Sequence, residues 1–132
     1  MSALLLDTTF LIDAERGGAA IDDAIGDEDD VAIAAVTLAE LRVGAHLADG
    51  RRASQRSDFV DAVAAGIPIL GYDAEVAEVH AGLLAHVRRQ GRPRGAHDLI
   101  IAATARAAER VVLTADPSGF QDLPGVIVVH HR

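Results

Sequence analysis

The chain contains no cysteine and no lysine, and only 3% of its residues are aromatic. Without cysteine it has no disulfide, no thiolate metal site and no cysteine nucleophile, so any metal must be held by oxygen or histidine. Without lysine it has no P-loop, no Schiff-base site and no lysine-dependent phosphotransfer site. One tyrosine and three phenylalanines are too few for a platform that stacks bases, so a module that only binds RNA is not expected.

Long hydrophobic runs are also missing. Hydrophobic residues make up 50% of the chain, but acidic residues, glycine or proline interrupt each run well before the ~18 apolar residues of a membrane span. The first residues, MSALLLDTTF, lack the basic start of a secretory signal, and their apolar run ends at Asp7. We therefore expect no membrane contact and a cytoplasmic location. The length suits one domain over residues 1–132.

Apolar runs of strand length alternate with segments of helical periodicity. Five runs predict strands, at 4–6, 31–36, 68–70, 111–114 and 126–129. Helices are predicted between them, the longest from about Ala74 to Arg89. The predicted strands are almost entirely apolar, as is typical of parallel strands that are buried on both faces. The pattern predicts an α/β fold with three layers, in which a mostly parallel central sheet is flanked by helices.

Four acids are candidates for a site, although each also has an ordinary structural role. Asp7 and Asp98 could cap helices. Glu40 stands three residues after Thr37, as in a capping box. Asp116 begins the turn-like segment Asp-Pro-Ser-Gly. Taken one at a time, these acids do not establish a function.

The positions of the four acids in the predicted fold favour a shared site. Asp7 and Asp116 follow predicted strands, and the other two acids fall in the first turns of helices. In an open parallel sheet such positions gather at the edge where the strand order reverses. Like charges brought together there require a cation or a retained proton. Hard divalent cations prefer oxygen ligands, so the sequence predicts a carboxylate site for a metal such as Mg²⁺.

Four segments of the chain resemble the PIN-domain ribonucleases, and more narrowly the VapC toxins of bacterial type II toxin-antitoxin pairs. The segments are LLLDTTFLIDA at 4–14, VTLAELRVGA at 36–45, GAHDLIIAATA at 95–105 and VVLTADPSGF at 111–120. They occur in the order and spacing of the family, over essentially the whole chain. The resemblance implies a PIN-like fold and the activity of an endoribonuclease that depends on Mg²⁺ or Mn²⁺.

The resemblance also implies the roles of individual residues in RNA phosphodiester hydrolysis by metal-activated water. The catalytic and metal-binding residues would be Asp7, Glu40, Asp98 and Asp116, with Asp116 as a second-site or water-held ligand. The hydroxyl of Thr9 would complete the pocket. The histidines are not expected to take part, and His97 is expected to point elsewhere on its helix.

The net charge of −8 means that contact with nucleic acid must be local. All 12 basic residues are arginine, and two groups of them stand near helix ends, at 51–56 and at 88–94. Both groups also fit a plain role as solvated helix ends. From the second group, Arg92 and Arg94 are the candidates for RNA contact, and neutralising them is expected to weaken RNA binding without affecting the metal.

Partners follow from the resemblance as well. A small cognate antitoxin of the VapB type is implied, which would inhibit the toxin by covering the acidic groove. An arginine of the antitoxin would suit the carboxylates, because its planar fork pairs with them bidentately. DNA contact would come only through the antitoxin. A homodimer is also implied.

Two other functions stay open at the level of sequence. A metal-dependent phosphatase also places acids at strand ends, but Asp7 is followed by two threonines instead of an Asp-x-Asp motif, and the lysine of such enzymes is absent. A non-catalytic PIN-fold interaction protein would keep the acids for structure. A metal titration separates this second alternative from an enzyme.

Overall fold

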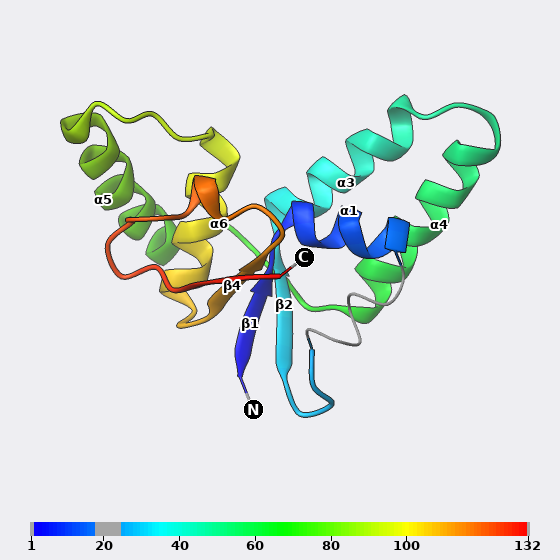
Figure 1. The fold of residues 1–132 in the computed structure, drawn as a ribbon, viewed down its shortest axis with the longest axis horizontal. Helices are drawn as coiled ribbons and strands as arrows, with labels where there is room; N and C mark the ends of the chain where they lie inside the picture. Colours follow the sequence, from blue (N-terminus) through cyan, green and yellow to red (C-terminus); the bar gives the residue numbers. More distant parts are fainter. Residues whose placement is uncertain (1, 18–24, 132) are drawn as a thin grey trace.

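A computed structural model describes residues 2–17 and 25–131 of the chain. Its strands form one sheet in the order β3-β2-β1-β4-β5, and every pairing is parallel (Figure 1). The strands are β1 (Ala3–Leu6), β2 (Asp30–Ala34), β3 (Ile69–Leu70), β4 (Val111–Thr114) and β5 (Val128–His130). The predicted α/β fold with a parallel central sheet is confirmed.

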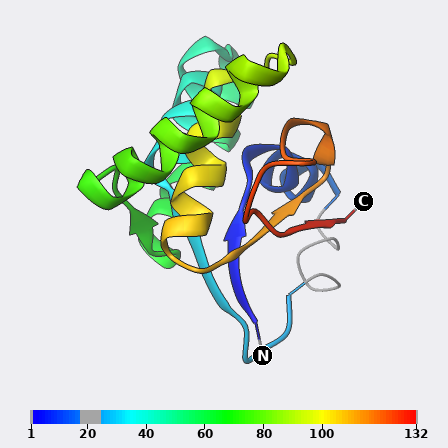
Figure 2. The ribbon, with the colours of Figure 1, turned by 90° about the vertical axis from the view of Figure 1, so that its left-hand side faces the viewer.

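Helices cover both faces of the sheet (Figures 1 and 2). They are α1 (Thr8–Gly17), α3 (Ala35–Leu47), α4 (Gly50–Gly66), α5 (Ala74–Gln90) and α6 (Ala96–Ala107), and a short 3₁₀ turn, η1 (Pro117–Gly119), follows β4. Alternation along β1 explains the two layers, because Leu4 and Leu6 join the core of α1, α3 and α4 whereas Leu5 joins the core of α5 and α6. No helix of the described ranges has both the length and the hydrophobicity of a membrane span.

The boundary between β2 and α3 differs from the prediction. The apolar run at 31–36 predicts a single strand, but β2 ends at Ala34 and α3 starts at the next residue. Val36 is apolar because it packs on the core of α5 and α6, so the run continues across the junction and does not mark it. Thr37 therefore lies inside α3 instead of capping it. The capping-box interpretation of Glu40 is wrong.

The strand order reverses at β1. From β1 the chain moves to β2 and β3 on one side, and it then returns to β4 and β5 on the other side. The reversal leaves the carboxyl ends of β1 and β4 next to each other, and the backbone N–H of Asp7 donates to the carbonyl of Leu113 at 3.0 Å. Residues that follow these two strands therefore share one edge of the sheet, which is the usual place for a ligand in an open α/β fold.

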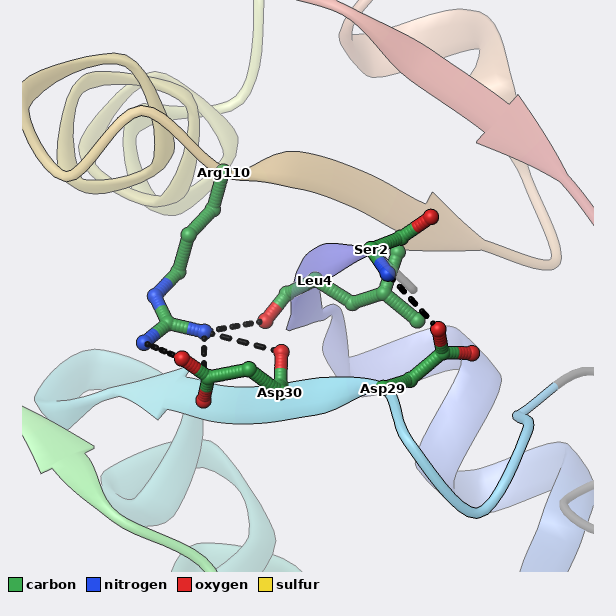
Figure 3. A network of polar contacts seen from close by, with 5 residues as sticks. All are labelled: Ser2, Leu4, Asp29, Asp30 and Arg110. Carbon is green, nitrogen blue, oxygen red and sulfur yellow. Dashed lines mark hydrogen bonds and ion pairs between the residues drawn. The ribbon is translucent and has the colours of Figure 1, made fainter.

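At the other end of the sheet, where the strands begin, Arg110 lies just before β4 and holds neighbouring strands together (Figure 3). Its guanidinium donates to the backbone carbonyls of Leu4, at 3.2 Å, and Asp30, at 2.9 Å. It also pairs with both carboxylate oxygens of Asp30 at 3.2 Å. Only 14% of the Arg110 side chain is exposed. One side chain thus joins the amino ends of β1, β2 and β4.

Replacing Arg110 by methionine is expected to lower the free energy of unfolding by about 2 kcal/mol, because two carbonyls and a carboxylate lose a charged donor. Urea unfolding of the purified protein measures the change. Arg89→Met is the matched control, since Arg89 is exposed at the end of α5. Equal unfolding midpoints for the two variants would contradict the role given to Arg110.

Candidate active site

The first candidate acid, Asp7, comes directly after β1 and is only 2% exposed. Its Oδ1 accepts a hydrogen bond from the backbone N–H of Thr9 at 2.5 Å, and its Oδ2 accepts one from the Thr9 hydroxyl at 3.1 Å. The buried hydroxyl of Thr114, at the end of β4, also donates to Oδ2. The N–H contact is a helix-capping interaction, so the structural role considered for Asp7 exists, but the two hydroxyls add partners that a cap does not need.

Burial raises the pKa of Asp7 above its ordinary value, and the nearby charge of Glu40 acts in the same direction. The hydrogen bonds from Thr114 and Thr9 oppose this shift, because they stabilise the ionised form. Thr9 is therefore located where the sequence places it, in contact with the first acid. Thr114 was not identified from sequence. Its only signal is a polar residue at the end of a buried strand, two positions before Asp116.

The second candidate acid, Glu40, projects from α3 and is held at both oxygens. The hydroxyl of Thr8 donates to Oε1 at 2.7 Å, and Nδ1 of His97 lies 3.1 Å from Oε2. A carboxylate only accepts, so the second contact is a hydrogen bond when Nδ1 carries the proton. The expectation that His97 points elsewhere on its helix is wrong. His97 faces the acids because α6 begins at Ala96 and brings its first turn against α3.

The third candidate acid, Asp98, is half-buried in the first turn of α6. Within residues 2–17 and 25–131, its carboxylate accepts no hydrogen bond. Two glycines leave room for it: a Cβ atom on Gly95 would lie 3.2 Å from Oδ2, and one on Gly119 would lie 2.8 Å from Cγ. Burial raises the pKa of Asp98, and the negative charges of the other three acids raise it further. Asp98 is thus the acid without a polar partner in the described chain.

The fourth candidate acid, Asp116, is exposed and caps η1. Its Oδ1 accepts hydrogen bonds from the backbone N–H of Ser118 at 3.1 Å and from the Ser118 hydroxyl at 2.7 Å. These bonds hold the pKa of Asp116 below its ordinary value. The turn suggested by the sequence is therefore real. Asp116 nevertheless lies close enough to Asp98 for its charge to raise the pKa of that residue.

Together the four acids gather at the carboxyl edge of the sheet, around the reversal of strand order. An open pocket of about 340 Å³ there is lined by Glu40, Gly95, Ala96, His97 and Asp98. In the part of the chain that the structure describes, no three acidic or histidine side chains are arranged to hold a metal ion directly. The donor set still fits Mg²⁺ or Mn²⁺, because Mg²⁺ keeps several waters and needs only one or two protein carboxylates.

The two arginines proposed for RNA contact lie in the loop between α5 and α6. Arg92 is exposed, and Arg94 is half-buried beside an apolar pocket that includes Val87 and Leu99. Nη1 of Arg94 is buried and has no hydrogen-bond partner in the described residues. Their contact with RNA stays a prediction, as do the metal-binding roles of the acids.

The fold and the acidic edge define an α/β domain with a carboxylate site at its topological switch point. The PIN domain family model matches residues 4–126. The chain is 38% identical to ribonuclease VapC5 of Mycobacterium tuberculosis, over 87% of this chain and 84% of that protein. It is 29% identical to ribonuclease VapC of Rickettsia bellii, over 96% and 94%.

A solved structure of a related protein also resembles this chain. The chain superposes on VapBC-5 of Mycobacterium tuberculosis, a member of the VapBC family of toxin-antitoxin systems, with a TM-score of 0.82 and 32% identity. That similarity covers 98% of this chain and 99% of the other. The chain therefore belongs to the PIN-domain family and, within it, to the VapC ribonucleases.

The raised pKa of Asp98 has a consequence for stability. Because the folded-state pKa lies above the ordinary value, the folded protein holds this proton to higher pH than the unfolded chain, and stability falls as pH rises through that interval. Above the folded-state pKa the carboxyl is ionised in both states, so the loss of stability is fully present there. Below the ordinary value of 3.8 the Asp98 carboxyl is protonated in both states, and this loss of stability disappears.

Asp98→Asn should therefore unfold at a higher temperature than the wild type at pH 7 without metal, by a few degrees. At pH 3 the difference should vanish. Thermal unfolding followed by circular dichroism measures both. Asp58→Asn, at an exposed position of α4, is the control and should show no gain. A lower melting temperature for Asp98→Asn at pH 7 would mean that the carboxylate is not under repulsion.

Proposed function

We propose that this protein is a metal-dependent endoribonuclease and the toxin of a VapBC-type toxin-antitoxin pair. The proteins that it resembles are named ribonuclease VapC and VapC5. The resident ion would be Mg²⁺ or Mn²⁺, held by Asp7, Glu40 and Asp98, with Asp116 at the rim. The reaction would be hydrolysis of an RNA phosphodiester bond.

The main support for the proposal is the surroundings of the Asp98 carboxylate. It lies between two glycines, half-buried, accepts no hydrogen bond from the described residues, and faces three other acids. A structural aspartate at the start of a helix would bond to backbone N–H groups there, as Asp73 does to the N–H of Val76 at 2.9 Å. An acid kept free among like charges is typical of a site that binds a cation.

The side chains around the acids would prepare them for this role. Thr114 and Thr9 oppose the rise in the pKa of Asp7, because their hydrogen bonds favour the ionised form of the buried carboxylate. Thr8 and His97 fix both oxygens of Glu40 and thereby its direction. The bound ion would lower the pKa of an attacking water and offset charge on the phosphate. One of the acids would accept the proton of that water.

A cognate antitoxin is proposed as the partner, because the solved relative belongs to a family of toxin-antitoxin systems. It would close the acidic pocket with a basic side chain, and an arginine suits a pair of carboxylates best. A homodimer is also proposed. Exposed apolar side chains on α3, Val43 and Leu47, are 53% and 78% accessible and could form part of such contacts.

Cleavage of total cellular RNA tests the proposed function. The purified chain should cut RNA with millimolar Mn²⁺ or Mg²⁺ and should not cut it with EDTA. Asp98→Asn, checked for folding, should lose at least ~100-fold in rate, and Asp58→Asn should retain wild-type activity. The same ions should raise the melting temperature of the wild type by mass action. A folded chain that neither cuts RNA nor responds to either ion would be an interaction protein with a PIN fold.

Gly119→Ala tests the geometry around Asp98 without removing a charge. The added Cβ would collide with the Asp98 carboxylate and force it to turn away, so the cleavage rate should fall roughly 10- to 100-fold. The melting temperature should stay near that of the wild type, because Asp98 has no hydrogen bond to lose within the described chain. Gly82→Ala on α5 is the control, since a Cβ there meets no atom within 4 Å. Wild-type cleavage by Gly119→Ala would refute the placement of Asp98 as a reacting group.

A further inference from the structure

A second pocket, separate from the acids, lies between the end of α1 and the first half of α4. It is open, has a volume of about 350 Å³, and is lined by Glu15, Arg16, Arg52, Gln55, Arg56 and Phe59. In Figure 1, α1 runs from the carboxyl end of β1 toward α4. The pocket therefore lies on the same side of the sheet as α1, at the far end of the helix that begins beside Asp7.

Three arginines meet in this pocket, which from here on is called the arginine pocket. Within residues 2–17 and 25–131, no carboxylate oxygen lies within 4.0 Å of a guanidinium nitrogen of Arg16, Arg52 or Arg56, although ion pairs at that distance form at Arg42 and Arg110. The only acidic residue among the lining residues is Glu15. The arginine pocket is thus a concentrated positive site on a chain whose net charge is −8.

The arginines of α4 stand where helix electrostatics disfavours them. Arg51 and Arg52 occupy the first turn of α4, which contains no acidic residue, and Asp49 makes no side-chain capping bond there. The amino end of a helix carries a partial positive charge, so cations there reduce stability. Residues that break a local rule without compensation in the fold are commonly functional. The partial positive charge of the helix end and the charges of the two arginines together attract an anion.

Arg56 is also held in position by packing. Its Nη1 lies against α3 so closely that a Cβ atom on Gly44 would come within 3.1 Å of it. The glycine therefore leaves space for the guanidinium between α3 and α4. A surface arginine that is only solvated does not need such space. Arg56 also lines the arginine pocket, and a planar guanidinium suits phosphate oxygens.

We propose that the arginine pocket binds a backbone phosphate of single-stranded RNA outside the scissile bond, an inference that rests on the proposed function. Arg16 lies about 12 Å along α1 from Thr8, which follows the first acid, so the pocket would hold a phosphate beyond the cleaved one. A bound phosphate there offsets the repulsion between RNA and the acidic site. Phe59 is the only large apolar residue among the lining residues, so the pocket offers little apolar area for docking a protein.

Binding of a labelled 12-nucleotide single-stranded RNA in EDTA tests the proposal, because EDTA prevents cleavage and separates binding from catalysis. Fluorescence anisotropy at several salt concentrations gives the affinity and its salt dependence. Arg52→Gln/Arg56→Gln should weaken binding about 10-fold or more and reduce the slope of log K against log salt by about 0.7, the value for one phosphate contact on a single strand. Arg51→Gln, which removes one charge from the same helix end outside the pocket, should reduce the slope by less than half as much.

The melting temperature distinguishes a binding role from a structural one. Removing Arg52 from the amino end of α4 relieves an unfavourable charge, so Arg52→Gln alone should melt no lower than the wild type. A lower melting temperature together with unchanged RNA binding would show that the arginines serve stability, and the proposal would be wrong. Unchanged affinity and salt slope in a chain that cleaves RNA would reject the arginine pocket while leaving the proposed function intact.

Two further outcomes also count against the arginine pocket. If the wild type shows no measurable binding of the RNA, the pocket is not an RNA site. If the double variant keeps RNA binding but loses binding of an oligoglutamate peptide that the wild type holds, the arginine pocket receives an acidic segment of a protein instead. A result in favour would be an Asp98→Asn variant that loses cleavage but keeps RNA binding, because binding and cleavage would then depend on different sites of the chain.

Discussion

Repulsion among carboxylates at one edge of the sheet is the constraint on which the rest of the site depends. Asp7 and Asp98 both have raised pKa values, from burial first and from neighbouring acids second. The neighbouring side chains differ from one acid to the next. Hydroxyls surround Asp7, Glu40 is fixed by a threonine and a histidine, and Asp98 is left free between glycines. Like charges brought this close require a cation or a retained proton, and the metal site proposed above would supply the cation.

Contacts away from the acids stabilise the fold against this repulsion. Two apolar layers cover the sheet, and Arg110 joins three strands at the edge opposite to the acids. Positive charge is gathered away from the acids, in the arginine pocket at the far end of α1. An acidic chain with a separate basic site can bind a polyanion locally without a positive surface overall.

Much of this could be predicted from sequence, because apolar alternation and strand-helix order are local signals. The parallel sheet follows from them, and Asp7 and Asp116 lie beside strand ends as predicted. The start of α3 could not be found, since the apolar run at 31–36 serves both a strand and a helix. The roles of His97 and Thr114 were missed, because their partners lie 57 and 107 residues away in the chain. Such contacts depend on the crossing of α6 with α3 and on the pairing of β1 with β4.

The proposed function requires that the acids form one metal site. Crystals of the protein soaked in Mn²⁺ test it most directly, because anomalous scattering locates the ion without assumptions about activity. An anomalous peak is expected in the pocket between Asp98 and Glu40, within coordinating distance of the Asp98 carboxylate or of waters that it holds. Asp98→Asn crystals are expected to lose this peak. A well-ordered pocket with no peak at saturating Mn²⁺, or peaks only at other surface acids, would contradict the proposed metal site.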